Sequence, residues 1–275
     1  MMPGMVDYRN DPAVCIFADT EAAMARLRRT AEAAGCRIVA MLPIGESSQP
    51  FAAVPMAPIL VELEAEAAGE TAIPLLDWLQ QEAERCGRRG IVSAPIGLID
   101  LVAGSATHAG IEHLCEASEA ERLAAVARAV APAAQRVCDD GGVSARVLQR
   151  SQDYAPDLAG PNDLEFVRAM LRARRLRNEH FSADLFADPA WDILLDLMAA
   201  RLARKRVTVS SLCVAAAVPP TTALRWIGVL VERGLLVRAV DSADRRRAFV
   251  ALSDAAARAL GGWLRQARRI ATEAL

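Results

Sequence analysis

The 275-residue chain predicts two domains, an α/β domain with a five-stranded parallel sheet followed by a smaller, mainly helical domain. First, strand and helix signals alternate through the first half, whereas residues 188–275 show several helices and a single pair of strands. Second, residues 1–130 carry a net charge of -8 and residues 201–275 a net charge of +9. Third, 53% of the residues are hydrophobic and only 24% are charged, which excludes global disorder.

The first domain is predicted element by element from short apolar runs and from helical spacing. Strands are expected at residues 13–18, 37–43, 59–63, 90–94 and 111–115, and helices at residues 21–35, 73–86, 96–103 and 118–130. Thr20 is placed to cap the first helix, and Ser118 with Glu121 forms a capping box for the last. Residues 44–58 are loop-like where a second helix would be expected. This alternation predicts a parallel sheet covered on both faces.

The middle of the chain is weakly patterned and predicts a linker over residues 131–162. The following segment, Leu164–His180, has five arginines and only a narrow apolar stripe, which favours a connecting or dimer-forming helix over a core helix. We therefore expect a first domain at residues 1–135, a linker with its helix at 136–187, and a last domain at 188–275.

The last domain has the element order of a winged helix-turn-helix. Asp188 and Pro189 start a helix that runs to about Arg204. A short helix is expected at residues 210–217, a third at 221–233, strands at 235–240 and 248–253, and a final helix from Asp254. In this order the third helix buries one face and offers the other to the major groove of DNA. The expected buried residues are Trp226, Ile227, Leu230 and Val231.

A set of polar and basic residues is expected to contact DNA. Thr221, Thr222 and Arg225 share the exposed start of the third helix, where hydroxyls, open N–H groups and a guanidinium suit phosphates and base edges. The alternative is that the two threonines only cap the helix. Arginines at the hairpin tip can enter a narrow minor groove, although a solvated turn is also possible. These are Arg245, Arg246 and Arg247, and Lys205 with Arg206 completes the basic set.

Two segments of this domain resemble MarR-type transcription regulators. The stretch D-S-A-D-R-R-R-A-F-V-A-L-S at residues 241–253 resembles the family's wing, with Asp241, Asp244, Arg246, Leu252 and Ser253 on its pattern. The stretch P-T-T-A-L-R-W-I-G-V-L-V-E-R-G-L-L at residues 220–236 resembles its recognition helix. The resemblance covers about a third of the chain and implies a homodimer on palindromic duplex DNA, with Arg246 or a neighbour in the minor groove.

The first domain is similar to a response-regulator receiver whose phosphorylation chemistry is missing. Asp19 follows the first strand, but Ala18 stands in the place of the second acid, and Glu62 stands where the phosphoacceptor Asp is expected. Ser93 matches the receiver pattern, Cys115 or Glu116 stands in the place of the Lys, and no Lys precedes Lys205. The resemblance implies a domain that is not phosphorylated and serves dimerisation, partner docking or occlusion of the DNA-binding domain. A flavodoxin-like domain that binds a small ligand at its strand ends is the alternative.

Other function classes lack their motifs. The chain has no G-x-S-x-G, HExxH or P-loop motif, so we expect no enzyme and no cofactor. Six scattered Cys without a CxxC pair, and only three His, predict no metal site. No secretory signal and no run of 18 apolar residues are visible, which predicts a cytoplasmic protein without a membrane span. The sequence thus predicts a homodimeric transcription regulator that binds double-stranded DNA. A protein-interaction module and a regulator that senses a metabolite in its α/β half are the alternatives.

Overall fold

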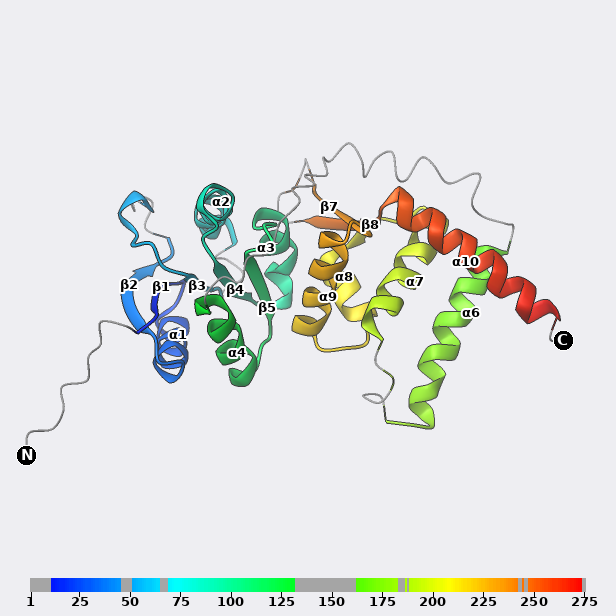
Figure 1. Ribbon diagram of the computed structural model, residues 1–275, viewed down its shortest axis with the longest axis horizontal. Coiled ribbons are helices and arrows are strands. Elements are labelled where there is room, and N and C mark those ends of the chain that lie inside the picture. The colour runs from blue at the N-terminus through cyan, green and yellow to red at the C-terminus, as the bar shows by residue number, and fades with distance from the viewer. Residues whose placement is uncertain are drawn as a thin grey trace, which may run out of the picture. The chain divides into compact units, whose positions relative to one another are not determined.

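The computed structural model in Figure 1 describes residues 11–45, 51–64, 69–131, 162–182, 186, 188–241, 244 and 247–273. The chain divides into two compact units, Met1–Cys138 and Asp139–Leu275, called here the first and the second unit. The predicted linker lies almost entirely outside the described residues, as do both predicted boundaries, after residues 135 and 187.

The first unit contains the five-stranded parallel sheet that the sequence predicts. Its strands are β1 (Ala13–Ala18), β2 (Arg37–Pro43), β3 (Ile59–Glu62), β4 (Gly90–Ala94) and β5 (Ile111–Cys115). Their spatial order is β2-β1-β3-β4-β5, and all neighbours are parallel. After β1 the chain forms the edge strand β2, and it then returns to the other side of β1 to form β3, β4 and β5. The carboxyl ends of β1 and β3 are therefore neighbours.

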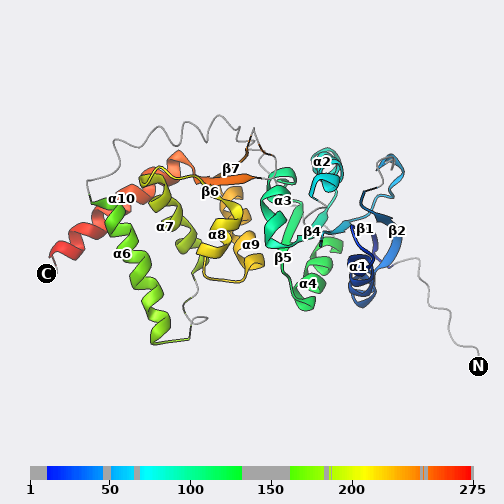
Figure 2. The ribbon, with the colours of Figure 1, turned by 180° about the vertical axis from the view of Figure 1, so that it is seen from behind.

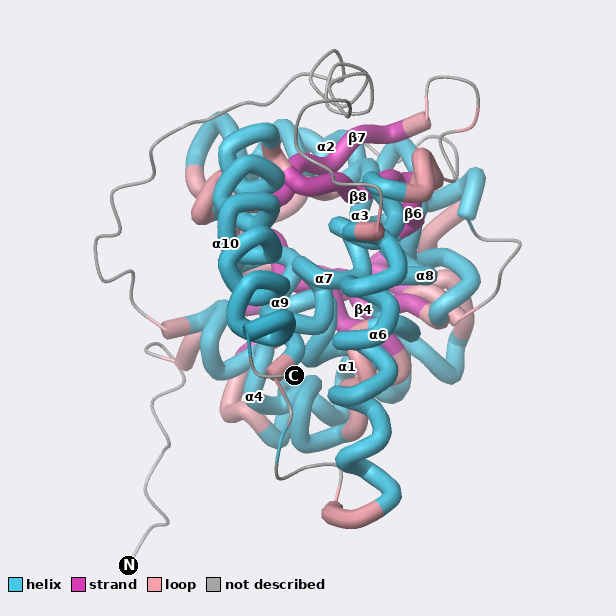
Figure 3. The backbone as a smooth tube through the Cα atoms, turned by 90° about the vertical axis from the view of Figure 1, so that its right-hand side faces the viewer, coloured by secondary structure: helices cyan, strands magenta, loops and turns pink. Residues whose placement is uncertain are grey.

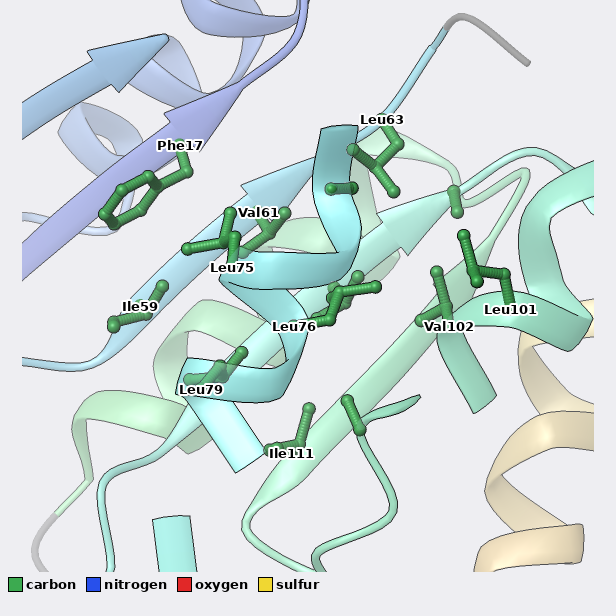
Figure 4. Packing of buried hydrophobic residues seen from close by; sticks show 14 of the residues in the cluster. Phe17, Ile59, Val61, Leu63, Leu75, Leu76, Leu79, Leu101, Val102 and Ile111 are labelled. Atoms are coloured by element: carbon green, nitrogen blue, oxygen red, sulfur yellow. The ribbon is translucent and has the colours of Figure 1, made fainter. Parts of the chain in front are cut away.

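Helices cover both faces of this sheet. Successive residues of a strand point to opposite faces, and consecutive residues of β1, β3 and β4 are buried, so both faces are packed. The helices are α1 (Glu21–Ala33), α2 (Gly69–Cys86), η4 (Ile96–Leu98), α3 (Ile99–Ser105) and α4 (Glu119–Val130). Residues of α1 and α4 pack with Val14, Ile16 and Leu60 on one face. Residues of α2 and α3 pack with Phe17, Ile59 and Val61 on the other, where Figure 4 shows Leu75, Leu76 and Leu79 of α2 above β3.

The predicted helix caps are present. The Thr20 hydroxyl accepts a hydrogen bond from the Ala23 N–H at 3.0 Å. Ser118 and Glu121 form both halves of the capping box at the start of α4. The helix α2 begins four residues before the predicted start, and Pro74 lies in its first turns.

The connection from β2 to β3 contains no α-helix among its described residues. It forms only the 3₁₀ turn η2 (Phe51–Ala53), which packs on α2 through stacking of Phe51 on Trp78, with ring centroids 5.0 Å apart. The buried Arg88 lies over Trp78 and donates a hydrogen bond to the Pro55 carbonyl at 3.0 Å. Aromatic stacking and one buried guanidinium thus stabilise this connection.

The second unit is mainly helical with one small antiparallel sheet. Its helices are α6 (Asp163–Leu176), η5 (Arg177–Glu179), α7 (Pro189–Leu202), α8 (Val209–Ala215), α9 (Pro220–Glu232) and α10 (Asp254–Glu273). Its strands are β6 (Val207–Thr208), β7 (Leu236–Val240) and β8 (Ala248–Leu252), in the order β6-β8-β7. The β7–β8 hairpin agrees with the sequence prediction, whereas the two-residue β6 was not predicted because it is too short to show a pattern.

The helix α7 is central in this unit and contacts α6, α8, α9 and β8. Figure 2 shows α7 between α6 and α8, and Figure 3 shows α6 and α10 on either side of it. Two ion pairs hold α6 in place, from Asp163 to Arg268 of α10 at 2.6 Å and from Arg174 to Asp192 of α7 at 2.5 Å. The arginine-bearing segment is therefore a packed helix of the second unit.

Among the described residues, no single helix is both long and apolar enough to cross a membrane. The consecutive helices α8 and α9 reach the necessary length only together, and they are bent by 113° with respect to each other.

Candidate functional site

Polar side chains gather at the carboxyl edge of the parallel sheet in the first unit. Ala18 at the end of β1 pairs in register with Glu62 at the end of β3, so the loops that follow both strands start side by side. The group comprises Asp19, Thr20, Arg26, Glu62, Glu64 and Arg122, and is called here the strand-end cluster. In open α/β sheets, ligands bind at the carboxyl ends of the strands, at the point where the strand order reverses.

Glu62 is the centre of the strand-end cluster. Its side chain is only 3% exposed, and its Oε1 accepts hydrogen bonds from Arg26 Nε at 2.7 Å and from Arg122 Nη2 at 3.2 Å. Its Oε2 is buried and has no hydrogen-bond partner among the described residues. Two guanidinium groups, one from α1 and one from α4, thus converge on one buried carboxylate and neutralise it.

The other two acids of the cluster, Glu64 and Asp19, also make hydrogen bonds within it. Arg26 also pairs with the Glu64 carboxylate, and the Thr20 hydroxyl donates to that carboxylate. The Asp19 carboxylate accepts the Glu64 backbone N–H at 2.9 Å and 3.1 Å from its two oxygens. Asp19 therefore fixes the start of the β3–α2 loop, and the cluster combines three acids with two arginines.

Ser93 and Cys115 lie at the same edge of the sheet, near the ends of β4 and β5. Ser93 is the register partner of Glu62, and Cys115 is the partner of Ala94. Both are buried, and burial raises the pKa of the Cys115 thiol to about 12, with a smaller contribution from Glu116. The thiol is neutral at physiological pH. The structure thus places Asp19, Glu62, Ser93 and Cys115 along one edge, as the sequence predicts, and none of the described residues form a metal-binding group of three or more His, Cys, Asp or Glu.

The two arginines of the cluster were missed by the sequence reasoning. Both lie in the first two turns of a helix that follows a sheet strand, Arg26 after β1 and Arg122 after β5. Helices in these positions start at the carboxyl edge of a parallel sheet. These two residues could have been found from the sequence as arginines in the first two turns of helices that start at the same edge of the sheet as the acid at the end of β3.

The start of α9 presents the first group of predicted DNA contacts. Pro220 begins the helix, and the residue before it, Pro219, makes no side-chain cap. Arg225 is exposed, and Thr221 and Thr222 are half-buried. The buried face consists of Ala223, Leu224, Ile227 and Leu230, whereas the predicted core residues Trp226 and Val231 are only half-buried.

Lys205 and Arg206 follow α7 and are both exposed. The guanidinium carbon of Arg206 lies 3.5 Å from the centroid of the Phe249 ring, which is a close cation–π contact. Its Nη1 lies 3.8 Å from Asp241 Oδ2. These two contacts hold the Arg206 charge beside the base of the β7–β8 hairpin.

The hairpin tip is closed by backbone hydrogen bonds between Asp241, Asp244 and Arg247. The Asp241 N–H donates to the Arg247 carbonyl at 2.9 Å, and the Arg247 N–H donates to the Asp244 carbonyl at 3.0 Å. Arg247 is exposed, with its Nε 3.5 Å from Asp244 Oδ2. The other two predicted tip contacts, Arg245 and Arg246, lie outside the described residues.

A further arginine, Arg238, lies in the middle of β7 and was not singled out from the sequence. Burial lowers its pKa to about 10, while the acidic groups of Cys213 and Glu232 act in the opposite direction. Its Nε has no hydrogen-bond partner among the described residues. The guanidinium still carries its charge at neutral pH and adds to the positive charge of the hairpin.

Comparison with known proteins returned no matching family model, no matching curated protein and no matching solved structure.

Proposed function

We propose that this chain is a transcription regulator that binds double-stranded DNA as a homodimer. Its second unit acts as a MarR-like winged helix-turn-helix, and its first unit acts as a receiver-like domain that is not phosphorylated. The observation that carries the proposal is the arrangement of α8, α9 and the β7–β8 hairpin in one compact unit, with a 113° bend between the two helices.

The helix α9 fits the role of a recognition helix. One face is buried against α7 and α8, and Arg225 points away from that face near the start of the helix. A guanidinium in this position can donate two hydrogen bonds to a guanine or one to a phosphate. Thr221 and Thr222, which are half-buried residues, add hydroxyl groups at the same helix end.

The hairpin fits the role of the wing. Its tip residues Asp241, Asp244 and Arg247 form a tight turn, and Arg206 is held against the hairpin by Phe249. Such preorganised cations lose little side-chain entropy when they meet a phosphate or a narrow minor groove. The +9 charge of residues 201–275 supports an anionic partner for this unit.

The receiver-like role of the first unit is supported by its strand order and by its strand-end cluster. The order β2-β1-β3-β4-β5 is the one found in flavodoxin-like sheets, receivers included. At the acceptor position Glu62 is paired with two arginines, where a working receiver needs an Asp accessible to Mg²⁺ and to a phosphoryl donor. We infer that an internal ion-pair network keeps this unit in one conformation. The unit then serves dimerisation or regulation without phosphorylation.

The test is a binding selection of the full chain on random duplex DNA at two salt concentrations. Enrichment of a palindromic site, with affinity that falls as salt rises, is the expected result for a dimeric sequence-specific regulator. Salt-sensitive binding without an enriched site would indicate a weakly specific DNA-binding protein. Absence of binding at both salt concentrations would contradict the proposal.

A further inference from the structure

The strand β2 differs from the other four strands of the sheet in its burial. Its sequence R-I-V-A-M-L-P is largely apolar, yet none of its residues is buried, whereas β1, β3 and β4 are buried almost throughout. It lies at the edge of the sheet and pairs only with β1. The described part of the connection that follows it contributes a 3₁₀ turn instead of an α-helix.

A shallow, open groove of about 470 Å³ lies at this edge. Arg28 and Glu32 of α1 line it together with Cys36 and the four consecutive strand residues Ile38, Val39, Ala40 and Met41. Ile38 and Met41 pack on the face of the sheet that α1 covers, and Val39 and Ala40 pack on the face that α2 covers. The groove is therefore lined by residues from both faces of β2 and follows the edge of the strand.

The backbone of β2 has hydrogen-bonding groups directed outward at this edge. The N–H groups of Arg37 and Ile44 donate inward, to the carbonyls of Pro12 and Ala18, both at 2.8 Å. The register with β1 shifts by one residue between Ile38 and Ala40, so Arg37 and Ile44 both donate inward although they are seven residues apart. After this shift inward and outward residues alternate, so the N–H of Met41, three residues before Ile44, points outward, and Pro43, which has no N–H, occupies another outward position. A half-buried apolar edge strand with outward backbone groups favours pairing with another strand.

We propose that this edge binds the same edge of a second copy of the chain, so that β2 pairs antiparallel with β2 and two five-stranded sheets become continuous. The charges beside the groove favour a second copy as the occupant. A two-fold axis perpendicular to the sheet places α1 next to α1 of the partner in antiparallel orientation. Arg28 and Glu32 are exposed, one helical turn apart and 3.8 Å from each other, so the rotation brings Arg28 against the partner's Glu32 and the reverse.

The proposed interface is self-complementary in two ways, by backbone pairing and by charge. Strand addition supplies main-chain hydrogen bonds, and the two symmetric ion pairs select the antiparallel register. It concerns the first unit alone and holds whether or not the second unit binds DNA.

The experiment is hydrogen exchange of the full chain without DNA, read by mass spectrometry on the peptide that contains β2 over a range of protein concentrations. The expected result is protection of β2 that increases with concentration in the wild type. Each of the charge reversals Arg28→Glu and Glu32→Arg places two pairs of like charges across the proposed interface. We expect the dissociation constant of the dimer to rise on the order of tenfold or more. The double variant Arg28→Glu/Glu32→Arg restores both pairs and should recover the wild-type value.

The control is Arg29→Glu, which makes the same charge change on α1 at an exposed residue that does not line the groove. It should leave the protection of β2 unchanged. Exchange of β2 that does not depend on protein concentration would overturn the proposal, and so would a weakening in the single variants that the double variant does not repair. A dimer formed elsewhere on the chain gives one of these two results.

Discussion

Arg26 donates its Nε hydrogen to Glu62 Oε1 at 2.7 Å, which connects the first helix of the first unit to the end of its central strand. Arg122 of α4 reaches the same oxygen at 3.2 Å. In the receiver-like role proposed above, Glu62 stands where a phosphoacceptor would be, and two guanidinium groups contact its carboxylate.

The first prediction concerns the stability of this cluster. Glu62→Gln keeps the size of the side chain but removes the carboxylate that Arg122 pairs with, whereas Arg26 keeps its pair with Glu64. We expect a decrease of about 3 kcal/mol in the free energy of unfolding, because the largely buried Arg122 loses its carboxylate partner. Urea unfolding of the full chain, followed by circular dichroism, measures it. The control Glu112→Gln removes a more exposed pair with Arg128 and should cost less than about 1 kcal/mol. Equal stability of Glu62→Gln and wild type would show that the network contributes nothing.

The second prediction concerns phosphorylation. Incubation with a small phosphoryl donor and Mg²⁺ should leave the intact mass unchanged, because Glu62 is buried and its Oε1 is shared by two guanidinium groups. The variant Glu62→Asp should behave in the same way, since Arg26 and Arg122 still face the carboxylate at the end of β3. A phosphate added to the wild-type chain would contradict the receiver-like role proposed here.

The third prediction concerns DNA binding. Arg225→Ala and Arg246→Ala should each weaken binding to the selected duplex and lower the slope of log affinity against log salt by about one unit for each phosphate that the variant no longer binds. If Arg225 contacts a base, that variant should instead relax specificity at one position of the site, by about 1–3 kcal/mol. Fluorescence anisotropy at several salt concentrations separates these two outcomes.

The control for DNA binding is Arg168→Ala. Arg168 is exposed on α6, and α7 lies between α6 and α9, so the change removes one positive charge from the same unit away from the proposed interface. It should leave the salt slope unchanged. If all three variants had the same small effect, DNA binding would depend only on net charge.

The fourth prediction concerns pH. Burial raises the pKa of the Cys115 thiol to about 12 in the folded protein, against 9.0 as its ordinary value. Between these values the unfolded chain has lost the proton that the folded chain keeps, so the free energy of unfolding falls as pH rises, by up to about 1.4 kcal/mol per pH unit from this thiol. Below the lower value both states are protonated and the contribution is constant.

Urea unfolding at about pH 8 and about pH 10 measures this dependence. Cys115→Ala should reduce the difference between the two pH values, although burial of Cys15 and Cys36 acts in the same direction and leaves part of it. Cys86→Ala, which removes an exposed thiol, should show the wild-type difference. An unchanged pH dependence in Cys115→Ala would show that this thiol titrates equally in both states.

Local sequence was sufficient for most elements of both units. Apolar runs located the five strands of the parallel sheet to within one residue, and Thr20 and Ser118 marked the starts of α1 and α4. These features depend on neighbours within a few residues, so their pattern is visible in the chain. The two-residue β6 left no such pattern, because it exists only through its pairing with β8.

The candidate site was predictable in part. The positions of Asp19, Glu62, Ser93 and Cys115 follow from strand order alone, since the carboxyl ends of parallel strands share one edge. The exposure of Arg225 follows from helical spacing, whereas the half-burial of Trp226 depends on how α9 packs on α7 and α8. Likewise the contact of Arg206 with Phe249 joins residues more than 40 positions apart.

The sequence by itself determined the alternation of strands and helices, the caps, the charge of the C-terminal segment and the residues available at the strand ends. Only the tertiary structure decided that Arg26 and Arg122 pair with Glu62, that α6 packs on α7, and that β2 is only half-buried at the edge of the sheet. The physical reason is the range of the interactions. Periodicity and capping act over one or two turns of chain, whereas ion pairs, burial and sheet edges depend on segments that meet only after the whole unit has folded.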